Sequence, residues 1–213
     1  MKARPRKKVL YLGRFQPFHK GHLEVIRFIL SQQLDVVLGI GCPMDGRTFR
    51  NPFSFEERER MVAAALGEAG MTVCKVVSVD DINDSPRWVE HVRRTVGDYD
   101  WVFTNSETDV ELFERAGDTV VGKGKMLVER GRFRGTKVRE LMASGNPDWE
   151  GLVPPAVLRV LKELGAEERV RELWKGMGRK CPECGKAVER CPEGHELCFG
   201  CGWQCDGCDW DGV

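Results

Sequence analysis

The sequence predicts an α/β fold, a doubly wound parallel sheet, followed by a small cysteine-rich module. Two observations predict it. Short apolar runs alternate with helical segments along residues 9–175, and such alternation is typical of parallel sheets with right-handed crossovers. Of the nine cysteines, seven crowd into residues 181–208. We therefore expect a sheet domain over residues 1–175 and a separate module over residues 176–213.

The expected elements follow from periodicity and from turn or capping residues. Residues 1–8 form a charged tail, and strands are expected at 9–12, 35–41, 72–79, 101–104 and 119–121. One helix is expected to begin near residue 20, and five more to cover 55–67, 88–96, 107–116, 136–142 and 157–173. Ser54 with Glu57 forms a capping box for the second helix. Leu158, Leu161, Leu164 and Leu173 make the apolar stripe of the last helix, which ends in a glycine hinge at 176–178.

Composition limits the classes of partner. Lys+Arg and Asp+Glu both total 33, so no global charge favours nucleic acid or a membrane surface. No stretch approaches 18 apolar residues, and no apolar signal core follows the basic N-terminus. We therefore expect a cytoplasmic protein. In that compartment clustered cysteines favour metal over disulfides, whereas Cys42 and Cys74, in apolar surroundings, are expected to be core thiols.

The stretch 9–26 organises the predicted domain. A buried strand enters a helix through a turn that carries His19 and His22 in the spacing His-x-Gly-His. The N–H groups at such a helix start can bind phosphate. Two imidazoles there can donate hydrogen bonds, or positive charge, to oxygens that gain charge as a phosphate bond breaks. The alternative is that both histidines only cap the helix.

Polar loops follow the predicted strands. The carboxyl ends of parallel strands meet at one edge of the sheet, where ligands of doubly wound folds bind. His19, His22, the 42–52 loop, the 80–88 loop and Asn105 all follow strand ends. We therefore expect them to converge.

The C-terminal cysteine-rich segment predicts zinc. Eight soft ligands lie within 28 residues: Cys181, Cys184, Cys191, His195, Cys198, Cys201, Cys205 and Cys208. Tetrahedral zinc takes four, so the count indicates two sites. The ligand order resembles a RING finger, which implies that Cys181, Cys184, Cys198 and Cys201 share one ion and that the other four ligands share the second. A ribbon with one ion and two stacked knuckles remain open. Metal must stabilise a segment too small to bury a core.

The charge of this segment bears on its partner. Residues 179–213 contain four Lys or Arg against seven Asp or Glu. An acidic segment is a poor nucleic-acid binder. A protein partner or a purely structural role fits the module better, and a ligase activity would rest on analogy alone.

Several motifs resemble one enzyme family. The run GRFQPFHKGHLEVI (13–26) resembles the first motif of the nucleotidylyltransferase superfamily, most of all archaeal-type nicotinamide-nucleotide adenylyltransferases. Asn51-Pro52-Phe53 with Glu57-Arg58, Asp81-Ile82-Asn83 with Trp88-Val89, and RFRGTKVRELM (132–142) extend the likeness over residues 8–175. The resemblance implies a Rossmann-like fold, transfer of the adenylyl group of ATP to nicotinamide mononucleotide, Mg²⁺ with the ATP, and a homo-oligomer.

The resemblance also implies roles for residues. His19, His22 and Arg139 would be catalytic, with Arg14 and Arg139 clamping the triphosphate. The implied substrate-binding residues are Arg14, Phe15, Gln16, Gly21, Arg50, Asn83, Trp88, Arg134, Gly135 and Thr136. Trp88 would stack on the nicotinamide ring, because an aromatic face suits a flat cation. The alternative for Trp88 is a core tryptophan at a helix start.

The sequence departs from the family pattern at three places. Residues 41–44 read Gly-Cys-Pro-Met in place of Gly-Ser-Ala-Gln, and residues 104–107 read Thr-Asn-Ser-Glu in place of Ser-Gly-Asn-Pro. Arg134 replaces the serine of the last motif, and we expect it to lie close to the triphosphate. Two alternatives therefore stay open: another phosphorylated acceptor, or a nucleotide-binding adaptor that acts through its zinc module.

Two other nucleotide motifs are excluded. Residues 117–123 fit G-x-x-x-x-G-K, but Gly124 stands where a P-loop needs Ser or Thr for Mg²⁺. No G-x-G-x-x-G follows the first strand, so the chain lacks the phosphate turn of a pyridine-nucleotide dehydrogenase.

Overall fold

The computed structural model describes residues 6–42, 47–104, 106–121 and 133–176, and two short strands at 189–190 and 196–197. The strands of the main sheet are β1 (Lys8–Gly13), β2 (Asp35–Cys42), β3 (Lys75–Asp80), β4 (Trp101–Phe103) and β5 (Val120–Val121). The helices are α1 (Lys20–Ser31), α2 (Phe55–Glu68), α3 (Ser85–Val96), α4 (Glu107–Arg115), α5 (Gly135–Ser144), η1 (Pro147–Leu152, a 3₁₀ helix), α6 (Pro155–Glu163) and α7 (Ala166–Gly176).

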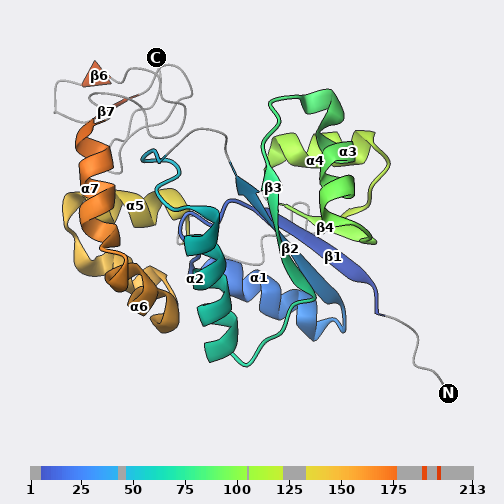
Figure 1. Cartoon of the computed structure of the whole chain (residues 1–213), viewed down its shortest axis with the longest axis horizontal. Coiled ribbons are helices and arrows are strands. Elements are labelled where there is room, and N and C mark those ends of the chain that lie inside the picture. The colour runs from blue at the N-terminus through green and yellow to red at the C-terminus, as the bar shows by residue number, and fades with distance from the viewer. Residues whose placement is uncertain are drawn as a thin grey trace, which may run out of the picture.

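The main sheet is parallel throughout. Its strand order is β3-β2-β1-β4-β5, so the chain starts in the middle and winds outward in both directions (Figure 1). This confirms the predicted doubly wound parallel sheet. The order reverses at β1, and the loops after β1, β2 and β4 therefore meet at one edge, where such folds bind ligands.

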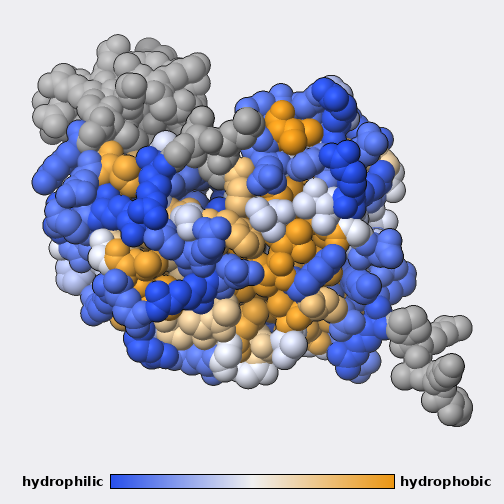
Figure 2. Space-filling view, in the orientation of Figure 1, coloured by the Kyte–Doolittle hydropathy of each residue, from blue (hydrophilic) through white to orange (hydrophobic). Residues whose placement is uncertain are grey.

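Two cores lie on opposite faces of the sheet. Val9 and Tyr11 of β1 face the larger core, which α1, α2, α5, α6 and α7 cover. Leu10 and Leu12 face the smaller core under α3 and α4. Because both faces of β1 are buried, its sequence is an unbroken apolar run. On the side shown in Figure 2, hydrophilic residues cover most of the helices and apolar residues gather in the middle, over the strands.

The predicted start of α2 is confirmed. The Glu57 N–H donates to Ser54 Oγ at 3.3 Å, and the Ser54 N–H donates to Glu57 Oε2 at 2.9 Å, which completes the capping box of α2. Gly145, at φ 74°, ends α5 in the left-handed conformation that glycine adopts at low cost.

The single long helix predicted over 157–173 is wrong. The structure has two helices, α6 and α7, separated at Gly165, whose φ is +59°. The Gly165 N–H donates to the Lys162 carbonyl at 3.1 Å and closes the last turn of α6. The leucine periodicity runs across the break because both helices place their leucines against the same core.

The prediction of two core thiols is wrong for Cys74, which is exposed, whereas Cys42 is half-buried. The strand β3 begins at Lys75, later than expected, so Cys74 lies outside it. Among the strands that the structure describes, β3 is an edge strand and has a neighbour on one side only.

The C-terminal segment is described only at β6 (Glu189–Arg190) and β7 (Glu196–Leu197), which pair antiparallel. The eight predicted zinc ligands lie outside the described residues. In the part of the chain that the structure describes, no helix is both long and apolar enough to cross a membrane.

Candidate active site

A cavity of about 870 Å³ opens at the carboxyl ends of the strands. Every catalytic or substrate-binding residue predicted from the sequence lines it except Gly21 and Arg134; the lining ones are Arg14, Phe15, Gln16, His19, His22, Arg50, Asn83, Trp88, Gly135, Thr136 and Arg139. The predicted convergence of the loops is therefore confirmed for the described residues. Asn105 lies outside them.

The two histidines stack on each other at the start of α1. Their ring centroids are 3.5 Å apart, and the rings are nearly parallel. The backbone N–H of His19, which is the N-cap residue, donates to Nδ1 of His22 at 3.1 Å. Because Nδ1 of His22 accepts this bond, the neutral ring carries its proton on Nε2. His22 therefore has one fixed tautomer, with Nε2–H as its donor.

Burial keeps both imidazoles neutral. Burial, together with the nearby guanidinium of Arg139, lowers the pKa of His19 to about 3. Burial also lowers the pKa of His22 well below its ordinary value, with a second contribution from His19. The sequence left open whether this pair donates hydrogen bonds or positive charge. In this geometry they are hydrogen-bond donors near neutral pH.

Arg139 joins the start of α5 to the turn after β1. It is 4% exposed, and its Nη1 donates to the Gln16 carbonyl at 2.6 Å, while Nη2 donates to Thr136 Oγ1 at 3.3 Å. A Cβ at position 135 would lie 2.8 Å from the Gln16 carbonyl oxygen, so only glycine fits there. The motif Gly-Thr-x-x-Arg thus packs α5 directly onto the histidine turn.

Gln16 and Phe15 have structural contacts besides lining the cavity. The Gln16 side chain donates from Nε2 to the Phe53 carbonyl at 2.8 Å and accepts the Phe53 N–H at 3.0 Å. Phe15 is buried and packs edge-on against Tyr11 and His22. These two residues hold the histidine turn and the segment before α2 together.

Arg58 is a support that sequence reasoning missed. It is 2% exposed, and its Nη1 donates to the carbonyls of Arg14 and Gly41, both at 2.7 Å. Its Nε donates to the Ser54 carbonyl at 3.0 Å, and its Nη2 donates to Cys42 Sγ at 3.1 Å. One guanidinium therefore fixes the backbone just past β1 and the end of β2. Only the resemblance pointed to Arg58.

Carboxylates line the opposite side of the cavity. Asp81 and Asp84 follow β3, and Asp109 lies in the first turn of α4. Burial raises the pKa of the Asp109 carboxyl, against hydrogen bonds from Ser106 and other neighbours that lower it. Trp88 is half-buried, lines the cavity and packs against the smaller core. Its stacking on a substrate ring stays a prediction. No sequence pattern pointed to Asp109.

Gly21 and Arg134 lie outside the lining. Gly21 is buried, and a Cβ there would lie 2.9 Å from Phe133 Cβ and 3.2 Å from the His19 ring. Its contribution is close packing around His19. Arg134 is exposed at the N-cap of α5 and makes no side-chain cap.

Among the described residues, no group of three or more His, Cys, Asp or Glu side chains could hold a metal ion. A divalent ion in this cavity would therefore depend on oxygens that a ligand brings. Phosphate oxygens with water are the usual ligands of Mg²⁺ in such sites.

Comparisons with known proteins agree with this geometry. The cytidylyltransferase-like family model matches residues 10–141. Nicotinamide-nucleotide adenylyltransferase of Picrophilus torridus is 36% identical over 166 residues, 78% of this chain and 96% of that protein. The enzyme of the same name from Ignicoccus hospitalis is 39% identical over 170 residues, 79% of this chain and 98% of that protein.

A solved structure shares the fold. It is a bifunctional NMN adenylyltransferase/ADP ribose pyrophosphatase from Francisella tularensis, with a TM-score of 0.61 and 21% identity. The match covers 81% of this chain and 54% of that one. The matched family model, the near full-length relatives and the convergent histidine and arginine side chains lead to one conclusion: this chain is a nucleotidylyltransferase of the cytidylyltransferase-like family and belongs with the nicotinamide-nucleotide adenylyltransferases.

Proposed function

We propose that the protein transfers the adenylyl group of ATP to nicotinamide mononucleotide, forming NAD and pyrophosphate. The observation that carries this proposal is full-length similarity to enzymes of that name, with 36% identity over 96% of one of them. The cavity also has the chemistry that the reaction needs. Cationic and neutral donors line one side, and a half-buried tryptophan lies among carboxylates on the other.

The reaction needs no protein nucleophile. A phosphate oxygen of the mononucleotide attacks the α-phosphorus of ATP, the new P–O bond forms, and the bond to the β-phosphate breaks as pyrophosphate leaves. The protein positions the two substrates and stabilises the charge that develops on the oxygens. In this proposal Nε2–H of His22 donates to that charge, and Arg139 and Arg14 neutralise the triphosphate.

Mg²⁺ accompanies ATP in this proposal and would neutralise charge on the departing pyrophosphate. The described residues suit a loosely held ion, because they offer isolated carboxylates near the cavity and no cluster of three. Triphosphate oxygens and water would supply most of its ligands.

The acceptor is proposed to lie beside Trp88. The nicotinamide ring of the mononucleotide is a flat cation, which an aromatic face and nearby carboxylates such as Asp81 and Asp109 attract. A second candidate, another phosphorylated acceptor, is kept because residues 41–44 and 104–107 differ from the family pattern.

The test is pyrophosphate release by the full chain with Mg-ATP or Mg-CTP and a panel of phosphorylated acceptors. We expect ATP with nicotinamide mononucleotide to be the fastest pair, with NAD as the product. Faster turnover of another acceptor would replace the proposed acceptor. Nucleotide binding without turnover of any acceptor would favour the adaptor alternative.

For residues 176–213 we propose a zinc module that docks a protein partner or acts structurally. The support is the eight-ligand pattern of the sequence, since the ligands lie outside the described residues. Metal analysis should find about two Zn²⁺ per full chain and none after truncation at Lys175. A purified chain without zinc would overturn this proposal. The cytoplasmic location and the homo-oligomer remain predictions.

A further inference from the structure

The loop before α2 carries two cavity residues but is held from the opposite side by α7. In the 47–53 loop, the Asn51 N–H donates to the Thr48 carbonyl at 3.0 Å and to Thr48 Oγ1 at 3.1 Å. This tight turn presents Arg50 and Asn51 to the cavity. The placement of those two side chains therefore depends on what holds the loop.

On the cavity side, the loop is joined to the histidine turn and to α5. Gln16 makes its two hydrogen bonds to the backbone of Phe53, and the Arg139 guanidinium lies 5.5 Å from the centroid of the Phe49 ring. Both contacts come from residues of the proposed active site. They fix one side of the loop only.

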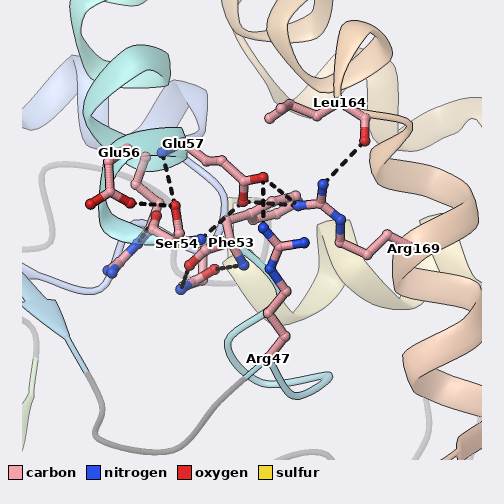
Figure 3. Close-up of polar contacts among 9 residues, drawn as sticks. Arg47, Phe53, Ser54, Glu56, Glu57, Leu164 and Arg169 are labelled. Atoms are coloured by element: carbon pink, nitrogen blue, oxygen red, sulfur yellow. Dashed lines mark hydrogen bonds and ion pairs between the residues drawn. The ribbon is translucent and has the colours of Figure 1, made fainter.

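On the far side, α7 supplies the remaining contacts. The Arg169 Nη1 lies 2.8 Å from both carboxylate oxygens of Glu57, and Arg47 of the loop donates to the same carboxylate at 3.1 Å (Figure 3). The Trp174 ring meets the Phe49 ring edge-on at 4.7 Å, and Arg169 also lies over Phe53 at 5.8 Å.

The Glu57 carboxylate is the point where these contacts meet. It caps α2 through the Ser54 N–H, it binds Arg47 of the loop, and it binds Arg169 of α7. The side chains of Glu57 and Arg169 are only 14% and 20% exposed. An ion pair that is mostly withdrawn from water and doubly hydrogen-bonded is stronger than an exposed one.

We propose that Arg169 and Trp174 of α7 are positioning residues that hold the 47–53 loop, and with it Arg50, against the substrate cavity. The kinetic part of this proposal, that loop placement affects substrate binding, rests on the proposed function. The structural part, that α7 holds the loop in place, does not. Both residues lie beyond residue 141, where the family model ends. The helix that contains them leads directly to the cysteine-rich segment.

The structural part is tested by hydrogen exchange in the full chain, with Arg169→Leu compared against Arg171→Ala. Arg171 is the matched control, because it lies on the same helix and pairs with Glu167 and Glu168, away from the loop. We expect amides of the 47–53 loop to exchange about tenfold faster in Arg169→Leu, and at the wild-type rate in Arg171→Ala.

The kinetic part is tested on the same proteins. Arg169→Leu should raise the KM of one or both substrates about tenfold with kcat changed by less than about threefold, because loop placement affects binding more than chemistry. Arg169→Lys, which keeps the charge, should recover part of the loss. Arg171→Ala should match the wild type.

Distinct outcomes separate the two proposals. Wild-type protein that makes no NAD would overturn the proposed function, while loop exchange would still decide the role of α7. Unchanged loop exchange in Arg169→Leu would overturn the positioning role. If exchange rises throughout the chain instead, Trp174→Leu decides, because it removes the ring contact with Phe49 and leaves the ion pair in place. Unchanged exchange of the 47–53 loop in Trp174→Leu would also overturn the positioning role of α7.

Discussion

The two sides of the cavity are built differently. On the histidine side, His19, Gln16 and Arg139 are each at most 6% exposed, and hydrogen bonds tie that side to α5 and to the segment before α2. On the other side, beside Trp88, where the acceptor is proposed to bind (the acceptor side), Asp81 and Asn83 are exposed and lie on a loop. The histidine side belongs to the larger core and the acceptor side to the smaller one.

This difference matches the demands of the proposed reaction. Stabilising charge on a breaking phosphate bond needs donors that are already oriented, which burial and hydrogen bonds provide. Holding an acceptor needs complementary shape and charge, which exposed loops can supply and vary. The departures from the family pattern fall in residues 41–44 and 104–107 and at Arg134, while the histidine turn keeps the family motif.

The largest expected effect tests the histidine side. His22→Ala should lower kcat by about two to three powers of ten, the usual loss for one oriented donor, and should change ATP affinity much less. Steady-state kinetics with calorimetric ATP binding would measure both. Normal turnover with poor ATP binding would show that His22 contributes to binding and not to the chemical step.

The next effect tests whether the histidine side is held neutral by burial. The pKa of His19 is lowered to about 3 in the folded protein, against about 6.5 unfolded. Between these values the unfolded chain binds more protons, so stability falls as the pH falls. We expect a loss of roughly 2–3 kcal/mol from His19 between pH 7.5 and pH 4.5.

Denaturant titrations of wild type and His19→Asn at several pH values would measure that contribution. Between pH 7.5 and pH 4.5 the free energy of unfolding should fall by roughly 2–3 kcal/mol less in the variant than in the wild type, whatever the variant's stability near neutral pH. If the free energy of unfolding depends on pH equally in both proteins, His19 is solvated enough to be protonated without cost. The two sides of the cavity would then not differ in burial as described.

How much of this site the sequence predicts depends on the range of the contacts. The His-x-Gly-His turn and the Ser54–Glu57 capping box lie within a few residues of chain, where spacing sets geometry, and both were predicted. The ion pair of Glu57 with Arg169 joins residues 112 positions apart, and no local sequence pattern predicts it. The same is true of Arg58, whose partners lie just past β1 and at the end of β2.

The fold shows the same limit. Apolar runs that alternate with helical segments predicted the parallel sheet, and the runs of the central strands β1 and β2 are buried on both faces. The break between α6 and α7 was missed, since leucine periodicity continues across Gly165 while the backbone conformation changes. Asp109 was missed because its position in the cavity depends on how α3 and α4 pack together, which spacing does not encode.

A smaller effect tests the acceptor side. Trp88→Ala should raise the KM for nicotinamide mononucleotide about tenfold, as loss of one stacking face does, and should leave kcat within about threefold. Trp88→Phe, which keeps an aromatic face, should recover most of the loss. An unchanged KM in Trp88→Ala would leave Trp88 as a packing residue of the smaller core, as the alternative predicted.

The smallest effect concerns Arg134, the exposed N-cap residue of α5. The sequence predicted a contact with the triphosphate, but Arg134 is exposed and does not line the cavity. An exposed charge acts weakly through water, so Arg134→Ser should weaken ATP binding by no more than about threefold at low salt. Calorimetry at two salt concentrations would measure it, and the difference should shrink as salt rises. A tenfold loss that persists at high salt would mean that Arg134 closes onto the triphosphate when ATP binds, and the original prediction would hold.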